Sequence, residues 1–129
     1  NMKRRFGISL PSDMVEKIDK LASILRIDRS KVIEQMLADS IEDRTHLLNP
    51  HKCRGILIVV SSGKNTHIIS EVFESYGECV KTRTHYHSGD ICIDIGIVEA
   101  ESKDILSMKR DFRRLKDVKE RYLPFQCVR

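Results

Sequence analysis

The amino-acid sequence predicts an α+β protein built from two dissimilar parts. In the first part, apolar and polar residues alternate over residues 3–10, and two stretches with helical spacing of apolar residues follow. In the second part, a continuous apolar run over residues 55–61 indicates a buried strand. Further along, the pair Gly89-Asp90 joins two alternating stretches, which is typical of a β-hairpin.

The composition is that of a soluble globular protein, because hydrophobic residues make up 40% of the 129 residues and charged residues 33%. No apolar run approaches the ~20 residues of a membrane span and no signal peptide opens the chain, so we expect a cytoplasmic protein without a membrane partner. The four cysteines are unevenly scattered, which favours free thiols or metal ligands over disulfides. The net charge of +4 is a mild indication of a polyanionic partner.

The first part is expected to contain one short strand and two helices. Phe6 and Ile8 share one face of the strand over residues 3–10, and Ser12 and Asp28 are natural N-caps for the two helices. Such a unit cannot fold alone, because a single strand has no partner for its backbone groups and three short elements bury too little surface. Antiparallel pairing of two copies solves both problems and forms a ribbon that can enter the DNA major groove.

The second part predicts the order β-α-β-β-α-β of ferredoxin-like and ACT-like domains, with both helices on one face of a four-stranded sheet. The expected elements are a strand over Gly55–Ser61, a helix that Thr66 caps, the hairpin over Cys79–Val98, a helix that Ser102 or Glu101 opens and that ends at about Leu115, and a strand over Val118–Phe125. Asn49-Pro50 marks a probable break between the parts. We therefore expect domains over residues 1–45 and 55–129, joined by a linker over residues 46–54.

The turn at Gly89-Asp90 determines which hairpin residues are neighbours. With this turn, His87 lies opposite Cys92 and His85 lies opposite Asp94, so all four side chains share one face. The isoleucines of the second strand share the other face, which we expect the helices to cover, leaving the His and Cys face to solvent or another subunit. Imidazole and thiolate are preferred ligands of Ni(II), Cu(II) and Zn(II), so the hairpin predicts a metal site.

A family resemblance rests on two stretches of the sequence. The stretch RRFGISLPSDMVEKIDKLASILRIDRSKVIEQML resembles the ribbon-helix-helix domain of bacterial and archaeal repressors. Together with THYHSGDICIDIGIVEA, it makes nearly the whole chain similar to the NikR-type nickel-responsive regulators. The resemblance implies a metal-responsive transcriptional repressor that binds double-stranded operator DNA, forms a homodimer through the N-terminal ribbon, and forms a homotetramer through the ACT-like domain.

The resemblance also implies how DNA would be bound. Outward side chains of the ribbon would read bases, and the start of the second helix would bind phosphate. The residues at these positions, together with a basic lead-in suited to backbone contacts, are Lys3, Arg4, Arg5, Gly7, Ser9, Arg29 and Ser30. Arg5 can bind guanine through two hydrogen bonds, whereas Gly7 has no side chain with which to read a base.

In the family that the chain resembles, two His and one Cys bind nickel in a square plane that a His from a neighbouring subunit completes. The corresponding residues here are His85, His87 and Cys92, but the turn between them is one residue shorter than usual and the fourth position is Glu74. A carboxylate there favours a tetrahedral Zn(II)-like site or a weak site over a planar Ni(II) site. Other candidates for the fourth ligand are His67, Glu78 and Asp94. Ni(II), Zn(II), another divalent transition metal and no metal at all therefore remain open.

Other functions are also considered. If the metal site is degenerate, the ACT-like domain would serve for oligomerisation or would sense another metal or a small molecule. A third interpretation is an antitoxin-like or purely structural assembler. An enzyme is not expected, because the sequence has no Ser-His-Asp order, no P-loop and no paired carboxylates in a recognisable setting. His46, His51 and Cys53 are close in sequence but lack a regular ligand spacing, so no second metal site is expected.

Overall fold

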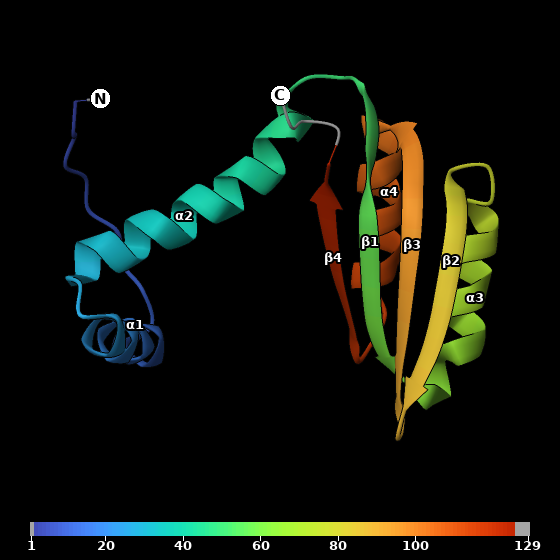
Figure 1. Ribbon diagram of the computed structural model, residues 1–129, viewed down its shortest axis with the longest axis horizontal. Coiled ribbons are helices and arrows are strands. Elements are labelled where there is room, and N and C mark those ends of the chain that lie inside the picture. Colours follow the sequence, from blue (N-terminus) through green and yellow to red (C-terminus); the bar gives the residue numbers. More distant parts are fainter. Residues whose placement is uncertain (1, 126–129) are drawn as a thin grey trace. The chain divides into compact units, whose positions relative to one another are not determined.

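The computed structural model describes residues 2–125 (Figure 1). Its contacts divide the chain into two compact units, residues 1–42 and 43–129. The domain boundaries expected from the sequence, with a linker over residues 46–54, stay a prediction. Of the four cysteines, Cys127 lies outside the described residues. In the described part of the chain, no helix is long and apolar enough to cross a membrane.

Most of the first unit consists of two helices, α1 (Ser12–Leu25) and the greater part of α2 (Arg29–Thr45). Ser12, which was expected to cap α1, is instead its first helical residue, because the cap position falls on Pro11. Helix α1 ends at Arg26, whose positive φ of 55° takes the backbone out of the helix. Asp28 caps α2 as predicted, since its side chain accepts a hydrogen bond of 2.8 Å from the backbone N–H of Lys31.

Residues 2–11 precede α1 and form neither a helix nor a strand within this chain. The strand expected over residues 3–10 requires a second strand, and no strand among the described residues of the single chain pairs with it. The expected apolar face is exposed to solvent, since 79% of the surface of Phe6 and 69% of that of Ile8 remain accessible. Among the described residues of this unit, only Ile18 and Val32 are buried. The unit therefore has a small core of its own and exposes apolar surface.

The second unit has the predicted order β-α-β-β-α-β. Its elements are β1 (Lys52–Ser62), α3 (Thr66–Ser75), β2 (Val80–Ser88), β3 (Ile91–Glu101), α4 (Ser102–Arg113) and β4 (Val118–Pro124), with short 3₁₀ turns η1 (His46–Leu48) and η2 (Gly63–Asn65). The four strands form one antiparallel sheet in the order β2-β3-β1-β4. Figure 1 shows α3 and α4 on the same side of this sheet. The α+β class and the ferredoxin-like arrangement are thus confirmed.

The core of the second unit lies between the helices and one face of the sheet. Helices contribute bulky side chains, and strands contribute Val, Leu, Ala, Cys and Tyr from the face that the helices cover. Phe73 of α3 and Phe112 of α4 contact each other with ring centroids 4.9 Å apart. The two helices are thereby joined over the centre of the sheet. The buried residues of the cluster are Cys53, Leu57, Val59, Ile69, Phe73, Val98, Ala100, Ile105, Met108, Phe112 and Tyr122.

The helices cover the opposite sheet face from the one expected. Along β3, Cys92 and Asp94 are buried, whereas Ile91 and Ile95 remain 45% and 42% exposed. The alternation of the sequence established which residues share a face, but the prediction assigned the wrong face to the helices. The reason is steric, because the covered face carries small residues that make room for aromatic rings. A Cβ at Gly96 would lie 3.3 Å from Cε1 of Phe73.

Candidate metal centre

The β2–β3 hairpin has the register that the sequence predicts. His87 pairs with Cys92, and His85 pairs with Asp94. Gly89 in the turn has a φ of 62°, a conformation that glycine adopts without strain. The four side chains therefore lie on one face, and α3 packs over that face.

Three candidate metal ligands come together on this hairpin. One ligand atom from each of His85, His87 and Cys92 lies within 4.8 Å of the other two. The Nε2 atoms of the two histidines are 2.9 Å apart, and Cys92 Sγ is 3.2 Å from His87 Nδ1. His87 is exposed and Cys92 is fully buried, so the group is open to solvent on the histidine side. The His87 ring can give one nitrogen to an ion and keep the other for a hydrogen bond.

Asp94 positions His85 within this group. Its Oδ1 atom is 2.7 Å from His85 Nδ1, and its side chain is completely buried while that of His85 is 27% exposed. When Nδ1–H donates to the carboxylate, the lone pair of His85 Nε2 is directed toward His87, where a metal ion would bind. Asp94 was considered as a fourth ligand, but its contact with the ring suits a group that orients a ligand.

Arg83 compensates the buried charge of Asp94. Its Nε and Nη2 atoms donate to Asp94 Oδ1 over 3.0 and 2.8 Å, and Nη2 also donates to Ser70 Oγ over 3.2 Å. The guanidinium carbon lies 4.5 Å from the centroid of the Phe73 ring, close enough for a cation–π contact. Two helical residues thus hold the arginine, which holds Asp94, which in turn orients His85.

The sequence prediction did not include Arg83. A signal for it was nevertheless present, since Arg83 is two residues before His85 and therefore points to the same face of β2. It pairs with Gly96, so Asp94 is its diagonal neighbour on β3. A positive side chain diagonally opposite a carboxylate is a pattern that favours an ion pair.

Thr66 connects Cys92 to the start of α3. Its hydroxyl donates to the carbonyl of Gly63 over 2.9 Å, and its Oγ1 is 3.4 Å from Cys92 Sγ. Because the Thr66 proton is used by Gly63, the Cys92 thiol can donate its own proton to Thr66 Oγ1. The predicted capping role of Thr66 was wrong: the cap position is Asn65, and Thr66 is the first residue of the helix.

The candidates for a fourth ligand lie on or just after α3. Glu74 and Glu78 are exposed, and His67 is exposed and pairs with Glu71 over 2.9 Å. The family resemblance implies that Glu74 supplies the fourth metal ligand to the site of a neighbouring subunit, and that role stays a prediction.

All seven residues expected to contact DNA are exposed, namely Lys3, Arg4, Arg5, Gly7, Ser9, Arg29 and Ser30. Arg29 makes two hydrogen bonds of 2.7 and 2.9 Å to the carboxylate of Asp19, which join the start of α2 to α1. These hydrogen bonds lower the pKa of Asp19 and raise that of Arg29. Both side chains remain about half exposed, at 58% and 47%, so a phosphate can compete with Asp19 for the guanidinium.

The structure combines an N-terminal pair of helices with a ferredoxin-like domain that carries a group of candidate metal ligands. Residues 4–44 match the family described as ribbon-helix-helix protein, copG family.

Similarity to known proteins extends over most of the chain. A "Putative nickel-responsive regulator" of Pyrococcus abyssi is 23% identical, and the match covers 89% of this chain and 87% of the relative. The "Putative nickel-responsive regulator 3" of Methanosarcina mazei is 26% identical, with 89% and 86% covered. The resemblance to nickel-responsive regulators expected from the sequence is thereby confirmed.

A likeness of fold extends to a solved structure. The structure of an uncharacterized protein from Thermotoga maritima has a TM-score of 0.56 and 16% identity, and it covers 58% of this chain and 99% of that chain. At this identity the likeness concerns the fold alone.

Proposed function

We propose that this protein is a metal-responsive, DNA-binding transcription regulator that acts as a repressor in the cytoplasm. The observation that carries the proposal is the convergence of His85, His87 and Cys92 on one hairpin, with Asp94 orienting one of the imidazoles. Metal-binding histidines commonly donate their second N–H to a carboxylate in this way. The match of residues 4–44 to a ribbon-helix-helix family supports the regulatory half of the proposal.

The separation of the two histidine nitrogens bears on which metal fits. With metal–nitrogen bonds of about 2.0 Å, neighbouring ligands lie about 2.8 Å apart in a square plane and about 3.3 Å apart in a tetrahedron. The two Nε2 atoms are 2.9 Å apart, a distance that a hydrogen bond between the rings also explains. The spacing is compatible with a planar Ni(II) or Cu(II) site, whereas a carboxylate as the fourth ligand favours a tetrahedral Zn(II)-like site.

A metal at this site would couple to the assembly of the protein. We propose that Glu74 of a neighbouring subunit supplies the fourth ligand, so that occupancy stabilises one arrangement of subunits over others. A ligand can shift such an equilibrium only by its difference in affinity for the arrangements, and a ligand bridge between subunits provides that difference. The spacing of the DNA-binding ends would change with occupancy.

Two apolar surfaces support assembly as a homotetramer. The exposed Phe6 and Ile8 of the N-terminal segment fit a ribbon formed by two copies. In the second unit, the sheet face turned away from the helices exposes Ile91, Ile95 and Leu123 at 45%, 42% and 50%. Apolar surface of this kind marks an interaction site. We propose that the ribbon forms dimers and that this sheet face joins them.

The DNA interface would be the paired N-terminal ribbon. Arg5 and Ser9 would reach base edges, Lys3 and Arg4 would contact the backbone, and the start of α2 at Arg29 and Ser30 would bind phosphate. The exposure of these residues supports the assignment. The seven-residue set thus combines contacts that position the protein with a few that read sequence.

The second candidate function keeps the regulator without high-affinity nickel binding. In that case the second unit would serve for oligomerisation or would sense another metal or a small molecule. Two observations favour this alternative. Glu74 stands where the nickel-binding family has a histidine, and the exposed isoleucine face suits contacts between subunits.

Metal titration of the full-length protein distinguishes the two candidates. Ni(II), Cu(II) and Zn(II) are added separately to the protein and to His85→Ala, with Asp90→Asn as the control because Asp90 is an exposed turn residue of the same hairpin. The proposal predicts binding at micromolar or lower concentration that His85→Ala weakens and Asp90→Asn leaves unchanged. Equal binding by His85→Ala and the unaltered protein would contradict the metal site.

A further inference from the structure

A second group of metal ligands lies at the beginning of the second unit. It consists of His46 on η1, His51 just before β1, and Cys53 on β1. One ligand atom from each residue lies within 4.8 Å of the other two. His46 Nδ1 is 3.3 Å from His51 Nε2 and 3.4 Å from Cys53 Sγ. The irregular spacing in the sequence did not indicate this cluster, because η1 and the extended residue Asn49 bring His46 back beside β1.

The His51 ring is oriented for metal binding. Its Nδ1 atom is 2.9 Å from the backbone carbonyl of Asn49, which can only accept a hydrogen bond, so Nδ1 carries the proton. The lone pair of the neutral ring is then on Nε2, which points at His46. A hydrogen bond from the second ring nitrogen to a carbonyl is the usual way in which a protein orients a metal-binding histidine.

His46 contributes a partly buried imidazole to the group. Its Nε2 atom is buried and has no hydrogen-bond partner among the described residues. The ring contacts His51 edge to face, with centroids 5.3 Å apart, and packs against Tyr122 at 5.9 Å.

Cys53 completes the group from inside the core. Its side chain is fully buried, and Sγ is 3.0 Å from the hydroxyl oxygen of Tyr122. If a metal ion displaces the thiol proton to solvent, the Tyr122 O–H can donate to the thiolate and stabilise its charge. A metal ion would thus bind a thiolate that accepts a hydrogen bond from Tyr122.

The distances match a tetrahedral ion. With bonds of about 2.0 Å to nitrogen and about 2.3 Å to sulfur, tetrahedral ligands lie about 3.3 Å apart for two nitrogens and about 3.5 Å for nitrogen and sulfur. The observed separations are 3.3 and 3.4 Å. We propose that His46, His51 and Cys53 form a second metal site, which binds Zn(II) or a similar tetrahedral ion independently of the hairpin site.

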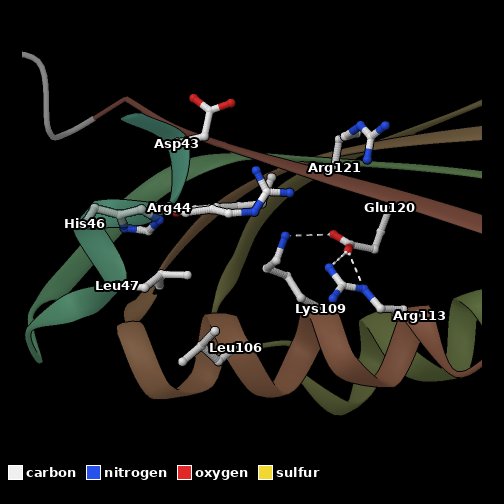
Figure 2. A pocket seen from close by; sticks show the side chains of 10 residues that line it. Asp43, Arg44, His46, Leu47, Leu106, Lys109, Arg113, Glu120 and Arg121 are labelled. Carbon is white, nitrogen blue, oxygen red and sulfur yellow. Dashed lines mark hydrogen bonds and ion pairs between the residues drawn. The ribbon is translucent and has the colours of Figure 1, made fainter. Parts of the chain in front are cut away.

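A cavity beside the cluster provides access. His46 and Tyr122 line a space of about 260 Å³ together with Arg44, Lys109 and Arg121 (Figure 2). Metal ions need an entry path, and a water from this cavity can supply the fourth ligand. The bound ion would tie η1, which follows α2 in the chain, to the first strand of the sheet.

Cobalt(II) titration tests the site, because a cobalt–thiolate bond gives a charge-transfer absorption and tetrahedral cobalt gives intense visible bands. The full-length Cys92→Ser variant is used, so that the hairpin site has lost its sulfur ligand and any thiolate band comes from elsewhere. We expect one equivalent of Co(II) with both signatures, and we expect Zn(II) to displace it. Absence of a thiolate band in this variant would overturn the proposal.

A second substitution assigns the ligands. Adding His51→Ala to Cys92→Ser should weaken Co(II) binding by at least ~10-fold and reduce the tetrahedral bands. His51 is the chosen position because it is only partly buried, whereas Cys53→Ser alters the core. The matched control is His67→Ala in the same background, which should bind as Cys92→Ser does. Unchanged binding in the His51→Ala variant would contradict the assignment, whatever metal the hairpin binds.

Discussion

Asp94 and His85 form a directly opposed pair across the hairpin, in which a completely buried carboxylate contacts the histidine Nδ1 atom over 2.7 Å. The pair connects the core to the candidate metal centre, because Arg83 holds the same carboxylate from the side of α3. The affinity of the hairpin for metal should therefore depend on a residue that need not touch the ion.

Asp94→Asn is expected to weaken metal binding at the hairpin by about 10- to 100-fold, because a neutral amide accepts a weaker hydrogen bond from His85 Nδ1–H than the carboxylate does and orients the ring less firmly. Isothermal titration with Ni(II) measures the loss. Asp90→Asn is the matched control, since Asp90 is an exposed turn residue of the same hairpin. Equal affinities for the two variants would show that Asp94 does not position His85.

Arg83→Ala is expected to destabilise the second unit by about 3 kcal/mol or more, because it leaves the buried charge of Asp94 without its main partner. Urea unfolding followed by circular dichroism measures the difference in the free energy of unfolding. Lys119→Ala, at an exposed position on β4, serves as the control and should change stability by less than about 0.5 kcal/mol. A comparable small effect of Arg83→Ala would contradict the compensating role.

Ile95→Glu is expected to disrupt the proposed tetramer and leave dimers, because it places a charge at the centre of the exposed isoleucine face. Ile95 pairs with Ile58 of β1 on that face and is itself 42% exposed. Sedimentation velocity of the full-length protein measures the assembly, and Lys81→Glu on β2 is the control. A tetramer that persists in Ile95→Glu would exclude this face as the interface.

Arg5→Ala is expected to abolish the mobility shift of a DNA fragment from upstream of the protein's own gene, while the oligomer stays intact. Loss of a bidentate contact to guanine typically costs about 1–3 kcal/mol. Lys17→Ala, an exposed lysine on α1, is the control for the change of charge. Wild-type binding by Arg5→Ala would refute the role of the ribbon in reading bases.

The ion pairs of Glu120 predict a loss of stability in acid. Burial opposes ionisation of Glu120, but hydrogen bonds and charge from Arg113 and Lys109 outweigh it and lower the pKa below its ordinary value of 4.5 (Figure 2). The carboxylate therefore contributes stability above that ordinary value, and the contribution is lost as the pH falls through the lowered pKa. Urea unfolding measures the free energy of unfolding of the unaltered protein and of Glu120→Gln. The two values should differ at pH 7 and converge in acid. A difference that is independent of pH would contradict this linkage.

Much of the hairpin was predictable from local chemistry. The Gly89-Asp90 turn and the strict alternation of β3 are enough to place His87 opposite Cys92 and His85 opposite Asp94, and the structure has this register. The order of strands and helices was also predictable from hydrophobic spacing. Arg83 was missed because its importance depends on a diagonal neighbour, which a reading of one strand at a time does not reveal.

The sequence by itself determined the elements, the register and the residues that share a face, because these follow from turn geometry and period-two alternation. Only the tertiary structure decided which face the helices cover, since that depends on how Phe73 fits over Gly96 and on compensation of Asp94 by Arg83. It also brought His46 beside His51 and Cys53, because the path of the chain through η1 and Asn49 has no periodicity that a sequence pattern can express.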